Sequence, residues 1–491
     1  MITQFRKTAA LVAGLCALGA LTTTGMAEAA ERPGPDGLWQ VDDYGTVLDV
    51  HSGRLDTYQV TAVSCLKGVA GTREKGAPAR YAMADGDVYT LRAGARAKMH
   101  IDGAPGDRSL QRLAALPATC HAPRPGAFDV FWQTFQENYP FFAAKGIDWQ
   151  EVRDRYRPRA EAARTDAELY GILTEMVAPL HDAHVVVSAD KTGFFGMTRP
   201  GTVVPGPDLD AEVTAFVERR DLAGRPLQRY ANGRIGYADV PAPGGGSYGY
   251  LRLSAFSGYS EQNTYAANRA ELDRALDAIL TPDRVHRLRG LILDVRINGG
   301  GSDSLGLDLA ARLTDRPYFA YAKRTRHTAP QPQHVRPAAA ARYAGPVALL
   351  TGGSTFSAGE TFTQAMMDRP APTTRIGEST QGVFSDVMER GLPGKGHGEW
   401  WFGLPNEEFL TRDGRTTFDG TGVPPLLPEP VFTDAEFAHD RDSAFDRAVR
   451  WLGERVCQGV DPGPLPRAGV RSALRGVAHR PGELRAGAGT R

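Results

Sequence analysis

Two segments of the chain share one pattern, in which a short apolar run leads into a glycine-rich turn and then into apolar residues at helical spacing. The first begins with GLILD at 290–294 and continues through VRINGGG at 295–301. The second begins with VALL at 347–350 and continues through TGGSTFS into a helical pattern that starts at Ala358. Strands that alternate with helices indicate an α/β fold with a mostly parallel sheet. We therefore expect an α/β core over residues 235–456.

The second turn places Ser357 at the first turn of the predicted helix. Backbone N–H groups are unpaired there, and the helix dipole favours negative charge. A hydroxyl at this position can attack a carbonyl, because donors for the developing oxyanion are already in place. Serine is also a common helix N-cap. The turn alone therefore leaves two interpretations, a nucleophile or a cap.

Composition limits the possible partners. The chain has 491 residues, of which 42% are hydrophobic and 23% charged, with a formal net charge of zero. These are values of an ordinary globular protein with several domains. A balanced charge gives no bulk attraction to nucleic acid or to anionic membranes, so we expect neither as a partner.

The first 29 residues have the pattern of a cleavable signal peptide. Arg6 and Lys7 precede an apolar stretch at 8–24, and AEA at 27–29 is a cleavage site. No other run is long enough to span a membrane. We expect an exported protein without stable membrane insertion, either periplasmic or extracellular, and a mature chain that begins near Ala30.

Export permits disulfides. Without Cys16 of the signal peptide, three cysteines remain, and Cys65 and Cys120 bracket one strand-rich segment. We expect these two to form a disulfide and Cys457 to stay single. No cysteine or histidine spacing indicates zinc.

The remaining chain divides by pattern. Segment 37–120 has β-branched and aromatic runs between turns and predicts a small all-β domain. Segment 126–188 predicts a helical bundle, because aromatic residues from Phe128 to Tyr139 form one helical stripe. Segment 189–234 is rich in Pro and Gly and predicts irregular structure. A last helix is expected over 434–453, and 460–491 has the composition of a disordered tail.

His184 lies where the third predicted helix of the bundle gives way to a strand. It ends the stretch LHDAH at 180–184, which VVV follows. A single histidine in this position is either a structural residue or a catalytic base on a rigid scaffold. No further ligand stands at metal-binding spacing, so we expect no metal.

Taken in order, these motifs resemble the C-terminal processing (tail-specific) and tricorn-type serine peptidases. HDAH at 181–184 resembles the D-x-H segment of that family, and DVRINGGG at 294–301 resembles its D-x-R-x-N-x-G-G turn. SAGE at 357–360 resembles the S-A-x-E nucleophile turn, and GTGVPP at 420–425 is a supporting match. The resemblance covers about 126 to 430 and implies a catalytic core with a crotonase-like (ClpP-like) fold.

The resemblance implies a Ser–His site. The other version of the family uses a Ser–Lys dyad, but no lysine lies between Ser357 and Lys395. Ser357 is then the nucleophile and His184 the base, while Asp419 stands where the family has Glu. Glu378 and Glu407 are alternatives for that third role.

Other positions follow from the same resemblance. The N–H groups of Ala358 and of Gly300 or Gly301 would form the oxyanion hole. The expected supporting residues are Asp294, Arg296, Asn298 and Glu378. The implied activity is hydrolysis of peptides or proteins without metal or organic cofactor. Segment 189–234 is too short for a complete PDZ module, which the family often carries there.

Two other functions stay open. A catalytically silent ligand- or lipid-binding protein could use the same fold. A crotonase-type acyl-CoA enzyme would use the same oxyanion geometry, although an export signal argues against CoA. The oligomeric state is not predicted.

Overall fold

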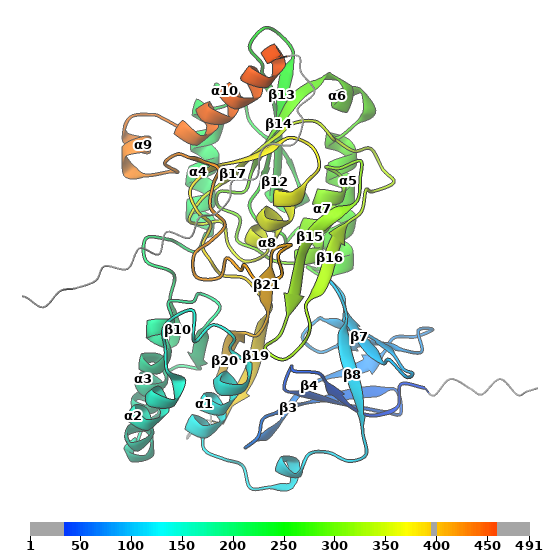
Figure 1. Ribbon diagram of the computed structural model, residues 1–491, viewed down its shortest axis with the longest axis vertical. Helices are drawn as coiled ribbons and strands as arrows, with labels where there is room; N and C mark the ends of the chain where they lie inside the picture. Colours follow the sequence, from blue (N-terminus) through cyan, green and yellow to red (C-terminus); the bar gives the residue numbers. More distant parts are fainter. Residues whose placement is uncertain (1–33, 394–399, 459–491) are drawn as a thin grey trace, which may run out of the picture.

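The computed structural model describes residues 34–393 and 400–458. Figure 1 shows a β-barrel (blue), a group of helices (cyan to teal) and an α/β core that carries the rest of the chain. The predicted signal peptide (1–29), Lys395 and the predicted tail (460–491) lie outside the described residues, as does the side chain of Cys457.

The N-terminal β domain is a closed eight-stranded barrel. Its strands pair in sequence, and the first pairs with the last. Trp39, Leu48 and Tyr81 are among the side chains that fill its own apolar core. Cys65 and Cys120 form the expected disulfide. The strands are β1 (Gly37–Val41), β2 (Thr46–His51), β3 (Arg54–Val60), β4 (Cys65–Arg73), β5 (Arg80–Met83), β6 (Val88–Arg92), β7 (Lys98–Ile101) and β8 (Arg108–Leu113).

Three helices follow the barrel: α1 (Ala127–Asn138), α2 (Trp149–Ala162) and α3 (Asp166–Val177). Asp148 caps α2, and Thr165 and Glu168 form a capping box on α3. The predicted aromatic stripe lies on α1, where Phe131 packs on Phe402 with ring centroids 4.9 Å apart. Helix α1 is therefore amphipathic because it covers a sheet.

That sheet has four strands in the order β10 (Phe194–Gly196), β9 (Val186–Ala189), β20 (Trp400–Pro405) and β19 (Val387–Leu392). Strands β19 and β20 belong to the segment predicted as α/β core, yet β20 pairs with β9 beside the helices and β19 pairs with β20 (Figure 1). The pairing is long-range, and nothing in the local pattern of 387–405 indicates its partner.

Segment 189–234 was predicted to be irregular, and this is wrong for much of its length. It contains helix α4 (Pro207–Arg220). Pro207 at the start and acidic residues in the first turn favour a helix there, and the buried Val213, Phe216 and Val217 lie on one face. The Pro- and Gly-rich flanks obscured this signal.

The α/β core is built on a seven-stranded sheet in the order β11 (Gln228–Tyr230), β12 (Ile235–Pro241), β13 (Ser247–Leu253), β14 (Leu288–Asp294), β17 (Val347–Thr351), β18 (Thr373–Gly377) and β22 (Leu427–Pro428). All pairs from β13 to β22 are parallel. The central strands β14 and β17 are almost fully buried, as expected for a parallel sheet covered on both faces.

Helices cover both faces of this sheet. One face packs on α5 (Tyr265–Ile279), α7 (Asp303–Ala311) and α8 (Ala358–Ala365), and the other on α4 and α10 (Ser443–Gln458). The predicted single helix over 434–453 is instead α9 (Asp434–Ala438) and α10, separated by a turn in which Asp440 has a φ of 52°. The remaining elements are α6 (Pro282–Arg287) and a sheet of β16 (Gln331–Val335), β15 (Tyr318–Arg324) and β21 (Glu408–Leu410).

The topology brings three turns together. Strands β14, β17 and β18 are adjacent and parallel, so their carboxyl ends lie at one edge of the sheet. The turn at 295–301, the turn at 351–357 and the segment 378–386 all start from this edge, which is where open α/β sheets bind ligands. No helix in the described part of the chain has the length and apolar character needed to cross a bilayer.

Candidate active site

Ser357 has a backbone that differs from an ordinary helix cap. Its φ is 52° and its ψ is −120°, whereas an N-cap residue normally lies in the β region. A non-glycine residue in such a conformation is strained, and strain of this kind is concentrated at functional sites. The side chain is partly exposed at the first turn of α8. This backbone is unlike that of an ordinary N-cap, although Ser357 and Glu360 also form a capping box.

The glycine turn lies directly against Ser357. A Cβ at Gly300 would come within 2.6 Å of Ser357 Cβ and 3.2 Å of the Ala358 nitrogen, and the φ of Gly300 is 79°. Only glycine permits this approach. The backbone N–H of Phe356 donates to the Asn298 carbonyl at 2.9 Å, which joins the two turns.

The expected oxyanion donors differ in availability. The N–H of Gly300 already donates to Asn298 Oδ1 at 3.0 Å, so the structure commits it to a side chain of its own turn. In the bridge to Phe256, the C=O of Gly300 and the N–H of Ser302 are used. The N–H of Gly301 takes no part in that bridge, so Gly301 is the more available of the two donors.

His184 is buried and oriented by its backbone neighbours. The Asp182 carboxylate accepts the His184 backbone N–H at 3.0 Å. The ring Nδ1 lies 3.2 Å from the Phe384 carbonyl oxygen. A carbonyl only accepts, so Nδ1 carries the proton and Nε2 has the free lone pair.

The imidazole lies beside the nucleophile turn. The rings of His184 and Phe356 are 5.1 Å apart between centroids, in a T-shaped arrangement. No hydrogen bond joins Ser357 Oγ to His184 within the described residues, and contacts of this kind are often looser in free enzymes than in complexes. Burial lowers the pKa of His184 below its ordinary value of 6.5, against the carboxylates of Asp182 and Asp386, which raise it. The ring is therefore neutral at pH 7.

Asp419 reaches His184 only through a peptide group. Its Oδ2 accepts the backbone N–H of Phe384 at 3.4 Å, and the same residue's carbonyl accepts from His184. Its Oδ1 lies 3.8 Å from Lys145 Nζ. Burial and the neighbouring Asp182 carboxylate raise the pKa of Asp419 well above its ordinary value.

The two alternative carboxylates are used elsewhere. Glu378 accepts the backbone N–H of Val431 at 3.2 Å. Glu407 is fully buried and lies 3.1 Å from Lys323 Nζ. Neither side chain contacts His184 through a hydrogen bond in the structure described.

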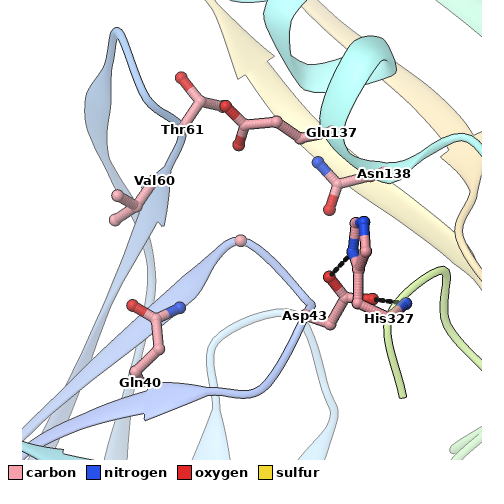
Figure 2. A pocket seen from close by; sticks show the side chains of 8 residues that line it. Gln40, Asp43, Val60, Thr61, Glu137, Asn138 and His327 are labelled. Carbon is pink, nitrogen blue, oxygen red and sulfur yellow. Dashed lines mark hydrogen bonds and ion pairs between the residues drawn. The ribbon is translucent and has the colours of Figure 1, made fainter. Parts of the chain in front are cut away.

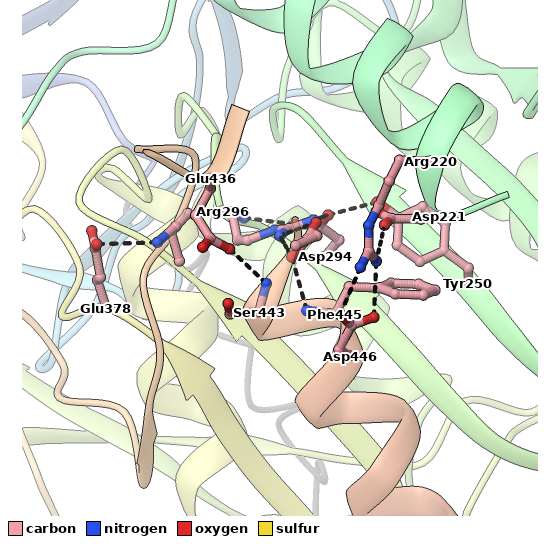
Figure 3. Close-up of polar contacts among 12 residues, drawn as sticks. Arg220, Asp221, Tyr250, Asp294, Arg296, Glu378, Glu436, Ser443, Phe445 and Asp446 are labelled. Atoms are coloured by element: carbon pink, nitrogen blue, oxygen red, sulfur yellow. Dashed lines mark hydrogen bonds and ion pairs between the residues drawn. The ribbon is translucent and has the colours of Figure 1, made fainter. Parts of the chain in front are cut away.

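Asp294 and Arg296 form a buried network behind the glycine turn (Figure 3). The Arg296 guanidinium donates to Asp294 Oδ2 at 2.7 Å and to both Asp442 oxygens at 2.7 Å. Tyr250 donates to Asp294 at 2.6 Å. Both Asp294 and Arg296 are almost fully buried. Their contacts link the turn to the start of α10 and give them no access to a substrate.

Glu360 had no predicted role beyond its place as the last residue of the SAGE motif. Its carboxylate accepts backbone N–H groups from Gly382 at 2.6 Å, Val383 at 2.8 Å and Ser357 at 3.3 Å. It therefore joins the nucleophile turn to the segment that holds His184. Burial raises the pKa of Glu360 to about 7.

We expect Glu360 to make stability depend on pH. Its folded pKa of about 7 exceeds its ordinary value of 4.5, so the folded state binds a proton more tightly than the unfolded state between these values. The free energy of unfolding should fall as pH rises through this window, by about 2–3 kcal/mol from this group. Urea unfolding of the wild-type protein and of Glu360→Gln, at about pH 5 and about pH 8, measures the difference. If the free energy of unfolding changed equally between the two pH values in both proteins, the prediction would be wrong.

Residues 199–205, for which no role was predicted, lie against the turns that start at the sheet edge. Arg199 donates to the carbonyls of Thr380 and Gln381 at 2.8 and 2.9 Å. Thr202 packs against Gly353, because a Cβ added to that glycine would lie 3.3 Å from the Thr202 side chain. Pro205 packs against Gly299, where an added Cβ would lie 3.4 Å from the Pro205 ring. The sequence carried no signal for these contacts because they join residues far apart in the chain.

Two family models match parts of this chain. Residues 247–427 match peptidase family S41, and residues 121–178 match the tricorn protease C1 domain. Curated proteins give no match. A serine-type peptidase is the class of protein that this fold and this site define. The chain carries the S41 peptidase domain with the tricorn-type segment before it, which confirms the family resemblance predicted from the motifs.

Several solved structures are similar to this chain. A "putative peptidase" from Parabacteroides merdae ATCC 43184 is 22% identical, with 68% of this chain and 98% of that chain covered and a TM-score of 0.54. Mature CPAF in complex with lactacystin is 14% identical, with 68% and 98% covered and a TM-score of 0.48. The photosystem II D1 C-terminal processing protease is 17% identical, with 67% and 96% covered and a TM-score of 0.41.

Proposed function

We propose that the protein is an exported peptidase that cleaves peptide or protein substrates through an acyl-enzyme, with Ser357 as nucleophile and His184 as base. The strained backbone of Ser357 beside Gly300 is the observation that carries this proposal. It presents the hydroxyl at a helix N-terminus, directly against the backbone of a glycine turn.

The orientation of His184 supports the base role. With Nδ1 held by the Phe384 carbonyl, Nε2 is free to take the proton of Ser357 Oγ as the oxygen attacks the scissile carbonyl. The imidazolium then protonates the leaving amine, and water attacks the acyl-enzyme with His184 again as base. The N–H groups of Ala358 and of Gly301 or Gly300 stabilise the oxyanion; one such donor contributes about 3 kcal/mol.

The third catalytic role passes through a peptide group. Asp419 holds the Phe384 N–H, and the Phe384 carbonyl orients the imidazole. In this proposal Asp419 is a positioning residue, because it acts on the ring only through that peptide.

The remaining parts of the proposal concern organisation. The core over 235–456 is crotonase-like (ClpP-like), with a signal peptide at 1–29 and a helical bundle at 126–188 before it. The mature protein acts in a periplasm or outside the cell, and the chemistry needs neither a metal nor an organic cofactor.

Active-site labelling tests the proposal. The purified mature protein is treated with a serine-directed fluorophosphonate, the modified residue is mapped by mass spectrometry, and a mixed peptide library is added to the unlabelled protein. We expect a single label on Ser357 and cleavage of peptides that labelling abolishes. An unlabelled, inert protein that retains a lipid through purification would instead support the ligand-binding alternative.

We also expect a low-pH limit set by His184. The base must be neutral, and burial lowers the pKa of this residue below 6.5. The acid limb of kcat/KM should therefore have its midpoint below pH 6.5. Because Glu360 titrates at about 7, the profile is measured in both the wild-type protein and Glu360→Gln. A midpoint above 6.5 in both would argue against His184 as the base.

A further inference from the structure

The β-barrel contacts the catalytic core beside the glycine turn. Ser302 directly follows Gly301, and its hydroxyl donates to the Gly103 carbonyl in the β7–β8 loop of the barrel at 2.7 Å. The backbone N–H of Ser304 donates to the same carbonyl at 3.3 Å. The loop is close-fitting, since a Cβ at Gly103 would lie 3.2 Å from Ser302 Oγ.

A second contact lies beside the segment that holds His184. Arg108, the first residue of β8, donates to Asp386 Oδ2 at 3.2 Å. Asp386 is two residues from Phe384, whose carbonyl accepts from the His184 ring. The Arg108 guanidinium stacks 4.1 Å from the centroid of the Tyr44 ring, and the Tyr44 hydroxyl hydrogen-bonds Glu407.

The segment Phe384–Asp386, which contacts both His184 and Arg108, has a strained backbone. Ser385 has a φ of 91° without being glycine. Its hydroxyl accepts the backbone N–H groups of Asn406 and Glu407 at 3.2 and 2.9 Å. Such a conformation persists only where its surroundings over-determine it. The salt bridge from Arg108, which is 20% exposed, supplies one of those constraints from outside the core.

A third barrel contact lies apart from both. Asp43 accepts from His327 Nδ1 and from the His327 backbone N–H, each at 2.8 Å (Figure 2). His327 lies in the loop between β15 and β16, and its side chain is 67% exposed. This contact joins barrel and core without touching the glycine turn or the Phe384 segment, so it provides a matched control.

We propose that the barrel is a working part of the active site, in which Arg108 positions the Phe384–Asp386 segment and Gly103 positions the turn that carries Gly301. The inference rests on the proposed function. The glycine turn and the Phe384–Asp386 segment both contain residues with positive φ. Asp386 lies two residues from Phe384, which orients the proposed base, and Ser302 follows Gly301, a proposed oxyanion donor. A displacement of about 1 Å at such a group can cost about 100-fold in rate.

The charges around Asp386 provide a readout that a purely structural contact would lack. Arg108 and Lys323 face the Asp386 carboxylate, with Lys323 Nζ 3.8 Å away. Lys323 Nζ also lies 3.1 Å from the Glu407 carboxylate. The His184 ring faces Asp182 and Asp386. Without Arg108, the Asp386 anion is less neutralised and favours the imidazolium, so the acid limb of kcat/KM should move to higher pH.

The test compares three variants of the full mature chain: Arg108→Gln, Arg108→Lys and His327→Ala. For Arg108→Gln we expect kcat to fall about 10- to 100-fold with KM changed less than about threefold, because Arg108 contacts Asp386 and not Ser357, His184 or the glycine turn. The rate of fluorophosphonate labelling at Ser357 should fall in parallel, and the acid limb should move up. Arg108→Lys keeps the charge and should recover much of the loss, while His327→Ala should behave like the wild-type protein.

Several outcomes would overturn the inference. One is a folded Arg108→Gln protein with unchanged kcat and pH profile. Another is a loss of kcat in His327→Ala as large as that in Arg108→Gln, which would mean that any contact between barrel and core has the same effect. If Arg108→Gln does not fold, Ser302→Ala removes the side-chain hydrogen bond of the other anchor, and an unchanged labelling rate in that variant contradicts the proposal. Absence of Ser357 labelling in the wild-type protein would instead reject the proposed function.

Discussion

Replacement of Ser357 by alanine is expected to lower kcat/KM for peptide cleavage by about 10⁴- to 10⁶-fold and to abolish fluorophosphonate labelling. The acyl-enzyme cannot form without the hydroxyl, and only the oxyanion donors and substrate binding remain to accelerate hydrolysis. The loss should appear in kcat, because the hydroxyl contributes to the transition state rather than to binding of the ground state. Steady-state kinetics with a fluorogenic peptide found in the library measure both parameters.

Ser354→Ala is the matched control for this variant. Ser354 lies in the same turn, is also partly exposed, and precedes the nucleophile by three residues. It should retain both labelling and turnover. A Ser357→Ala protein that keeps its fold and cleaves at the wild-type rate would show that the strained serine is not the nucleophile.

His184→Ala is expected to have an effect of similar size, with kcat reduced by about 10⁴- to 10⁶-fold. The imidazole activates the hydroxyl and protonates the leaving group, so its loss disables both halves of the reaction. Since the two residues act as one unit, the double variant Ser357→Ala/His184→Ala should be no slower than either single variant. Additive losses would contradict a Ser–His pair.

His181→Asn is the control for the histidine. His181 is exposed, lies three residues before His184 and has a φ of 47°, which asparagine tolerates better than most residues. The variant should keep near wild-type kinetics and an unchanged pH profile. A loss equal to that of His184→Ala would assign the effect to the fold of the 180–185 turn rather than to the base.

The parts of the site that the sequence predicted are those that local pattern encodes. The glycine run at 299–301 and the small residues around Ser357 report close backbone approach, and the structure has Gly300 against Ser357. The helix-to-strand junction at His184 follows from a change of period. The predicted donor role of Gly300 fits less well, because the N–H of that residue is used by Asn298 within its own turn. That choice depends on a side-chain rotamer, which no pattern encodes.

The sequence by itself indicated the α/β class of the core, the family resemblance, the two glycine-rich turns, the candidate serine and histidine, and the disulfide, because periodicity, turn chemistry and motif spacing are local properties. Only the tertiary structure decided which carboxylates and cations surround the base. Asp386 and Arg108 belong to no motif, and Glu360, the last residue of SAGE, had no predicted role. The contacts of these residues join segments 22 to 278 residues apart. Such contacts depend on how the barrel, the four-stranded sheet and the core pack together, and that packing is set by the whole chain at once.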